Sequence, residues 1–78
     1  MQEIEIAQLL DTRGLNCPMP LLKTKQALHK LTSGAVLKVI ATDAGSVRDF
    51  QAFIERSDHE LLQMFIETSE YTYLIRRG

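Results

Sequence analysis

Two prolines in alternate positions, directly after the only cysteine of the chain, constrain the fold more than any other feature. Residues 16–20 read Asn-Cys-Pro-Met-Pro, and residues 21–31 have the pattern of a helix. Proline is tolerated in the first turn of a helix, because the backbone N–H groups there have no intrahelical partner. The pattern predicts a helix that starts here, with Cys17 as the N-cap, Pro18 at the first helical position and Pro20 at the third.

A cysteine at a helix N-terminus can be a reactive nucleophile. The positive end of the helix dipole lowers the pKa of a nearby thiol, which raises the fraction present as thiolate. A lone cysteine at an arbitrary position is more often a small buried apolar residue. Cys17, however, lies between a turn over residues 13–16 and the double-proline helix start, and such boundaries are mostly exposed. We therefore predict a partly exposed Cys17 with a lowered thiol pKa.

Length and composition indicate one small domain spanning residues 1–78. Apolar residues make up 45 % of the chain and charged residues 24 %, which is typical of an ordinary globular domain. One cysteine excludes an intramolecular disulfide, and no apolar run approaches the ~20 residues needed to cross a bilayer. The acidic N-terminus does not resemble a secretion signal, so we expect a cytoplasmic protein without a membrane partner. The net charge of −1 argues against direct nucleic-acid binding.

The hydrophobic pattern predicts strands and helices in the order βαβαββ. Alternation over residues 3–11 predicts a strand, and a slip or bulge near residues 7–8 would account for the consecutive Leu9 and Leu10. In the first helix, which Gly34 is expected to close, the buried positions are Leu21, Thr24, Leu28 and Leu31. The continuous apolar run over residues 35–42 is typical of a central strand.

The second half of the chain predicts a helix and a hairpin. Ser46-x-x-Asp49 resembles a capping box, with Ser46 as the N-cap of the second helix. That helix is expected to bury Val47, Phe50, Phe53 and Ile54. Residues 59–68 and 71–76 are predicted to form two strands joined by a tight turn at residues 69–70.

These elements predict an α+β fold, a two-layer sandwich of a four-stranded mixed sheet with two helices on one face. A strand–helix–strand unit makes a parallel pair with a right-handed crossover, so the first two strands should end at the same sheet edge. Sites form outside the carboxyl ends of parallel strands. We therefore expect residues 43–46 to lie beside the sulfur of Cys17.

The sequence offers Cys17 neither an acid–base partner nor a metal site. His29 lies twelve residues along the helix, about 18 Å away at 1.5 Å per residue. His59 opens the third strand and, if that strand is parallel to the first two, begins at the opposite edge. A thiol without such partners suits a carrier, whose sulfur accepts a group from one protein and passes it to another. Activation would then come from the helix end, with Arg13 adding positive charge and Gly14 supplying a positive φ in the loop.

The motif around Cys17 resembles the signature of the TusA/SirA family of small sulfur-carrier proteins. The matching residues are Leu10-Asp11-x-x-Gly14-Leu15-x-Cys17-Pro18-x-Pro20, followed by Gly34, Asp43, Asp49, Phe50, His59-Glu60-Leu61 and Tyr71-x-Tyr73-x-Ile75-x-Arg77. The resemblance implies a two-layer βαβαββ sandwich and a persulfide on Cys17, supported by Arg13, Gly14, Pro18 and Pro20. It further implies a persulfide donor, either a cysteine desulfurase or a rhodanese, and a downstream sulfur-acceptor protein. We expect no metal and no cofactor.

Two positions depart from the member of this family that acts in tRNA thiolation. Met19 stands where that member typically has glutamate, and Asp43-Ala44 stands where it has Asp-Pro. The resemblance therefore leaves open tRNA thiolation, molybdenum-cofactor supply and sulfur oxidation. It implies a sulfurtransferase-like carrier that acts stoichiometrically and is not a self-contained catalyst.

Two alternative functions and one candidate partner surface complete the sequence-based hypotheses. A regulatory or RNA-binding module of the same fold would not use Cys17 as a carrier, and the acidic balance of charge disfavours it. A thiol-reactive enzyme such as a reductase is disfavoured because there is no resolving cysteine. On the first helix, Met19 and Leu22 share an arc next to Lys23 and away from the buried stripe, which predicts a small apolar docking surface beside the sulfur. A single exposed apolar residue would also need no explanation.

Overall fold

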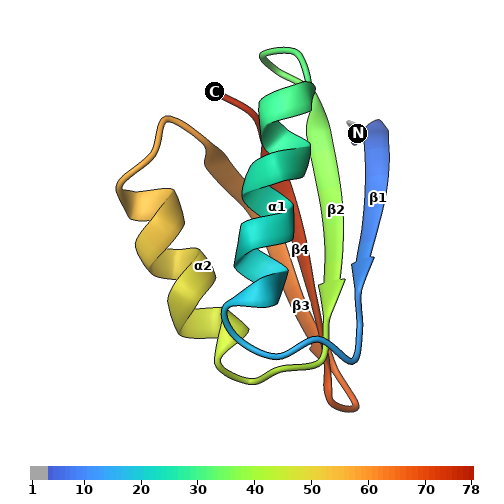
Figure 1. Cartoon of the computed structure of the whole chain (residues 1–78). Coiled ribbons are helices and arrows are strands. Elements are labelled where there is room, and N and C mark those ends of the chain that lie inside the picture. The colour runs from blue at the N-terminus through green and yellow to red at the C-terminus, as the bar shows by residue number, and fades with distance from the viewer. Residues whose placement is uncertain (1–3) are drawn as a thin grey trace.

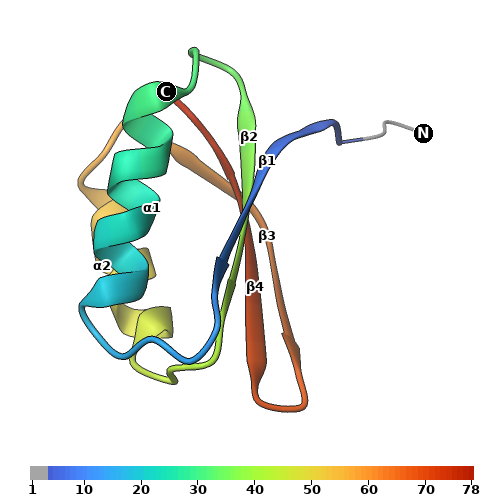
Figure 2. The ribbon, with the colours of Figure 1, turned by 45° about the vertical axis from the view of Figure 1, so that its right-hand side comes forward.

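Two helices cover one face of a four-stranded sheet, as the hydrophobic pattern predicts (Figure 1). The computed structural model describes residues 4–78. Its elements are β1 Ile6–Thr12, α1 Met19–Lys30, β2 Val36–Ala41, α2 Ser46–Glu55, β3 Glu60–Glu67 and β4 Glu70–Arg76. The strand order is β1-β2-β4-β3, in which β1 is parallel to β2 and the other pairs are antiparallel. The predicted α+β, two-layer architecture is confirmed, and Figure 2 shows both helices on the same side of the sheet.

The core lies between the helices and the two central strands. Its fully buried side chains include Leu28 of α1, Phe50 of α2, and Leu37, Val39, Tyr73 and Ile75 of the sheet. The predicted stripe of α1 is confirmed, because Thr24 and Leu28 are buried and the two outer leucines pack against the core. Phe50 stacks on Tyr73 with a distance of 4.2 Å between ring centroids. This contact fixes α2, and the loop before it, against the centre of the sheet.

An irregularity at the start of β1 explains the broken alternation of its sequence. The pairing register with β2 shifts between Ile6 and Gln8, where a slip or bulge was expected. After the shift, Leu10 pairs with Val39 and packs against the core, while Leu9 is 57 % exposed. The strand begins at Ile6, so the predicted start at residue 3 is wrong for residues 4 and 5, and residue 3 lies outside the described residues.

The hairpin of β3 and β4 turns one residue earlier than predicted. Glu67 pairs with Glu70, so the turn residues are Thr68 and Ser69 and the expected turn at residues 69–70 is wrong. Both have positive φ, 40° and 68°. A two-residue turn with two positive φ values matches the right-handed twist of the strands, and it usually contains Asn or Gly. Thr68 and Ser69 therefore gave no recognisable sequence signal for this turn.

Both helix starts differ from the predicted ones. The N-cap of α1 is Pro18, so Met19 is the first helical residue and Cys17 precedes the cap. The N-cap of α2 is Gly45, which has no side chain to bond the first turn. The prediction of a capping box is therefore wrong, and Ser46 and Asp49 make other contacts.

The end of α1 also differs from the prediction. The helix ends at Lys30 with Leu31 as its C-cap. Gly34 has a φ of +91° and lies in the turn before β2, where its N–H donates to the carbonyl of Arg77 at 2.8 Å. Within residues 4–78, neither helix is long and apolar enough to cross a membrane.

Candidate functional site

The loop after β1 and the loop after β2 run side by side at one edge of the sheet (Figure 1). The first loop carries Cys17 and leads into α1, and the second carries Asp43 and leads into α2. This arrangement follows from the parallel pairing of β1 and β2, which brings both carboxyl ends to the same edge. The predicted placement of Cys17 beside residues 43–46 is confirmed by a direct hydrogen bond.

Two carboxylates from the second loop and α2 hold Cys17. The backbone N–H of Cys17 donates to Oδ2 of Asp43 at 2.6 Å, and the other oxygen of Asp43 accepts the N–H of Gly45 at 3.2 Å. The thiol of Cys17 donates to Oδ2 of Asp49 with a distance of 2.7 Å between Sγ and Oδ2. Cys17 is nevertheless exposed, so a reagent or a partner protein can reach the sulfur.

The same carboxylates raise the pKa of the Cys17 thiol. The largest cause is the hydrogen bond to Asp49, which stabilises the protonated thiol, followed by partial desolvation and by the negative charges of Asp49 and Asp43. Arg48 acts in the opposite direction and lowers the pKa. The prediction of a lowered thiol pKa is therefore wrong. Two carboxylates act on the thiol, and Cys17 is not the N-cap residue of α1.

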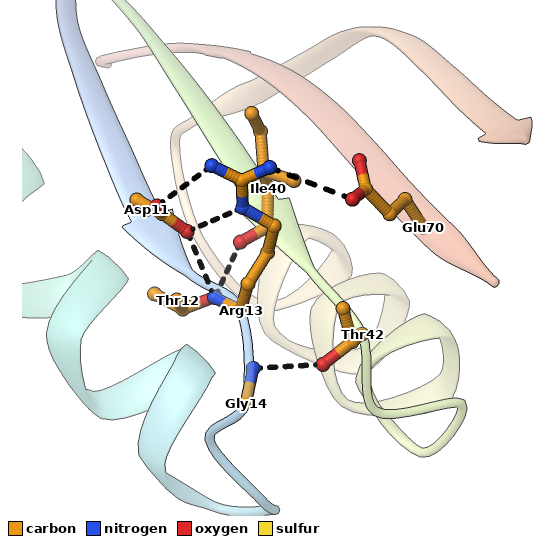
Figure 3. A network of polar contacts seen from close by, with 7 residues as sticks. All are labelled: Asp11, Thr12, Arg13, Gly14, Ile40, Thr42 and Glu70. Carbon is orange, nitrogen blue, oxygen red and sulfur yellow. Dashed lines mark hydrogen bonds and ion pairs between the residues drawn. The ribbon is translucent and has the colours of Figure 1, made fainter.

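Arg13 has a role different from the one predicted (Figure 3). Its guanidinium forms two hydrogen bonds of 3.0 Å with the carboxylate of Asp11, and it lies 3.5 Å from Glu70 on β4. The bond to Arg13 lowers the pKa of Asp11 to about 2. The charge of Arg13 is thus balanced within this cluster, and the cation that lowers the pKa of Cys17 is Arg48. The idea that Arg13 activates the sulfur is wrong.

Two hydrogen bonds join the end of β1 and the loop after it to the end of β2 and the loop that follows that strand. The N–H of Gly14 donates to the hydroxyl of Thr42 at 2.9 Å, and the hydroxyl of Thr12 donates to the carbonyl of Ile40 at 2.7 Å (Figure 3). Gly14 has a φ of +82°, so the predicted positive φ is confirmed. Because this segment is bonded to the end of β2 and to the residue after it, the position of Cys17 is set relative to Asp43 in the same loop.

The two prolines are in very different surroundings. Pro18 is exposed, and its carbonyl accepts the N–H of Leu22 at 3.0 Å in the first turn of α1. Pro20 is fully buried beneath that turn, and its carbonyl accepts the hydroxyl of Thr24 at 2.8 Å. The Cys17–Pro18 peptide bond is cis. Pro20 therefore contributes to the core as well as to the start of the helix.

The residues of the predicted docking surface lie on the exposed side of α1. Met19 is 39 % exposed and Leu22 is 43 % exposed, and Lys23 is also exposed. Leu22 is therefore not covered by the hairpin. The use of these residues in partner binding stays a prediction.

Sequence reasoning missed Asp49 as a partner of the sulfur. The expected capping box gave Asp49 a local role, so its position in the first turn of the neighbouring helix was not connected with Cys17. The histidines are elsewhere, as expected: Nδ1 of His59 accepts the N–H of Gly78 at 2.9 Å. His29 and His59 together line a shallow pocket with Arg77. Among residues 4–78, no group of three or more His, Cys, Asp or Glu side chains is arranged to hold a metal ion.

Comparisons with known proteins give matches over almost the whole chain. Residues 8–77 match the family described as sulfurtransferase TusA. The sulfur carrier protein TusA of Allochromatium vinosum is 47 % identical over 71 residues, covering 91 % of this chain and 93 % of that protein. The putative sulfur carrier protein YrkI of Bacillus subtilis is 39 % identical, covering 91 % of this chain and 95 % of that protein.

A solved structure shows the same fold. The crystal structure of a SirA-like protein from Desulfitobacterium hafniense superposes with a TM-score of 0.70 at 26 % identity, covering 91 % of this chain and 97 % of that one. The sequence matches and the fold lead to one conclusion. This chain belongs to the sulfurtransferase TusA family.

Proposed function

We propose that this protein is a sulfur carrier, which binds a sulfane sulfur as a persulfide on Cys17 and relays it between proteins. The observation that carries the proposal is the exposed thiol of Cys17 at the sheet edge of a chain that belongs to this family. Among the described residues, the thiol has no histidine partner that would suit a hydrolytic reaction, since its hydrogen-bond acceptor is Asp49. A free thiol as the resting state fits a reducing compartment such as the cytoplasm.

The loading step is a thiol exchange that needs no oxidant. The thiolate of Cys17 attacks the outer sulfur of a persulfide on the donor, R–S–SH, and the S–S bond of the donor breaks. A new S–S bond forms at Cys17, and the donor leaves as a thiol after taking up the proton that Cys17 has lost. The sum is Cys17–SH + R–S–SH → Cys17–S–SH + R–SH. A cysteine desulfurase or a rhodanese supplies the donor persulfide, and a downstream protein accepts the sulfur.

The exposed side of α1 supplies the docking surface for these partners. Met19 and Leu22 offer apolar area within the first turn after Cys17, and methionine adapts to differently shaped partners. Lys23 adds a charge at the rim that affects the association rate more than the affinity. A carrier must bind at least two partners and release both, so a small surface of this kind suits the task.

Mass spectrometry tests the proposal directly. The protein is incubated with a cysteine desulfurase, its PLP cofactor and free cysteine, and the intact mass is measured without reductant. We expect a gain of one sulfur atom, about 32 Da, that dithiothreitol removes. The Cys17→Ser variant is the control and should gain nothing. An unchanged wild-type mass, or an equal gain in Cys17→Ser, would rule out Cys17 as the carrier.

A further inference from the structure

The Asp49 carboxylate contacts the reacting sulfur and has no other hydrogen bond among residues 4–78. It lies in the first turn of α2, where the N-cap is Gly45 and no side chain caps the helix. The thiol of Cys17 donates to this carboxylate with a distance of 2.7 Å between Sγ and Oδ2, so the contact depends on the thiol hydrogen. The contact is therefore specific to the discharged, protonated form of Cys17.

Loading of Cys17 with sulfur removes the thiol hydrogen on which this contact depends. In a persulfide, Sγ carries the second sulfur in place of hydrogen, so it has only lone pairs to direct at Asp49. Persulfides are more acidic than thiols, so the outer sulfur of the loaded carrier becomes anionic at a lower pH than the thiol of the discharged one. The negative charges that act on Cys17 are Asp49 and Asp43, and the positive charge is Arg48. An attractive contact in the discharged form thus becomes a repulsive one in the loaded form.

We infer that Asp49 biases the relay toward delivery, by stabilising the discharged thiol and destabilising the persulfide on Cys17. The inference rests on the proposed carrier function. The delivery step is Cys17–S–S⁻ + R–SH → Cys17–SH + R–S–S⁻. The bond between Sγ and the outer sulfur breaks, a bond from the outer sulfur to the acceptor forms, and the acceptor proton ends on Sγ. Asp49 acts on both sides of this equilibrium, because it accepts a hydrogen bond from the product thiol and repels the reactant anion.

An exchange equilibrium measures this bias without a partner protein. The purified carrier is equilibrated with a fixed ratio of glutathione persulfide to glutathione, and the ratio of loaded to discharged carrier is read from intact mass spectra. Asp49→Asn keeps the size of the side chain and removes its charge. We expect the loaded-to-discharged ratio to rise at least about threefold in Asp49→Asn. A threefold change in an equilibrium constant has the same free energy as a pKa shift of about half a unit. Asp49→Ser, a second neutral variant, should shift the ratio in the same direction.

The control is Asp58→Asn, which makes the same change of net charge at an exposed position after α2. It should load like the wild type. A second readout is the pH midpoint of iodoacetamide alkylation, which should fall in Asp49→Asn and stay unchanged in Asp58→Asn. A purely structural role for Asp49 would lower the thermal midpoint without moving the loading ratio or the alkylation profile.

The outcomes separate the two proposals. A wild-type protein that takes up no sulfur overturns the proposed carrier function. A wild-type protein that loads, together with Asp49→Asn and Asp49→Ser variants that load to the same ratio, overturns the delivery bias and leaves the carrier function intact. An equal shift in Asp58→Asn also overturns it, because the effect would then belong to net charge and not to the contact with Sγ.

Discussion

The hydroxyl groups of Ser46 and Tyr73 lie 2.7 Å apart in the interior, and they join the first turn of α2 to the central strand β4. Both residues are buried, and the ring of Tyr73 also stacks on Phe50. Burial raises the pKa of Tyr73, so its hydroxyl is protonated throughout the neutral range. The hydrogen bond between Ser46 and Tyr73 holds α2, and with it Asp49, in place beside the sulfur of Cys17.

Removing one hydroxyl of this pair should destabilise the domain. Tyr73→Phe leaves the buried hydroxyl of Ser46 without its partner, which should lower the free energy of unfolding by about 1–3 kcal/mol. Urea denaturation measures the change. In the double variant with Ser46→Ala neither group is left unpaired, so its loss should be smaller than the sum of the two single losses. Strictly additive losses would show that the two hydroxyls do not interact.

The thiol of Cys17 should react slowly at neutral pH. Its pKa is raised, so thiolate appears only as the pH rises through a value above that of a free cysteine, about 8.5. The rate of iodoacetamide alkylation against pH gives this midpoint. A midpoint below that of free cysteine would contradict the hydrogen bond from Sγ to Asp49.

Two arginines should differ in their effect on the sulfur. Arg48→Gln removes the cation that lowers the pKa of Cys17, so the alkylation midpoint should move to still higher pH. Arg13→Gln is the matched control and should leave the midpoint in place, because its charge is balanced by Asp11 and Glu70. Equal shifts of the alkylation midpoint in the two variants would mean that the midpoint depends on the net charge of the protein and not on the position of the arginine.

Replacement of the buried Pro20 should lower the stability of the domain. Pro20→Ala removes about two buried methylene groups, so the free energy of unfolding should fall by about 1–2 kcal/mol, at about 0.8 kcal/mol per group. This loss adds to the cost of about 1 kcal/mol or less that comes from the lost stiffening of the unfolded chain. Urea denaturation of the variant and the wild type measures this loss. An unchanged free energy of unfolding would show that the packing of Pro20 is unimportant.

A charge on the exposed side of α1 should impair transfer without unfolding the domain. Leu22→Glu places a carboxylate in the proposed docking surface, so the KM for a desulfurase or rhodanese donor should rise while the thermal midpoint stays near that of the wild type. Leu9→Glu carries the same change at a residue of β1 that is 57 % exposed, and it should leave the KM unchanged. Wild-type transfer by Leu22→Glu would place the docking surface elsewhere.

The hydrophobic pattern was sufficient to predict the architecture and the location of the site. The buried stripe of α1, the apolar run of β2 and the parallel crossover rule together place Cys17 beside Asp43. These features depend on which residues are buried and on the order of the elements along the chain, and both can be read from a single sequence. The irregularity of β1 was also visible, because Leu9 and Leu10 break the alternation.

The finer chemistry of the site could not be predicted in the same way. Asp49 fits a local capping pattern in the sequence, and only the packing of α2 against the sheet turns its carboxylate to the sulfur. The direction of the pKa shift of Cys17 depends on that contact, so a dipole argument alone gave the wrong sign. The turn at Thr68 and Ser69 was missed because neither residue is typical of positive φ.

The anchoring of the loop after β1 has a consequence for retargeting the protein. Gly14 and Cys17 are hydrogen-bonded to Thr42 and Asp43, which directly follow β2. These bonds hold the sulfur at the edge of the sheet and do not involve the exposed side of α1. The position of the sulfur therefore does not depend on the outward side chains of α1. We expect that the outward side chains of α1 can be exchanged for those of another carrier while the sulfur keeps its place.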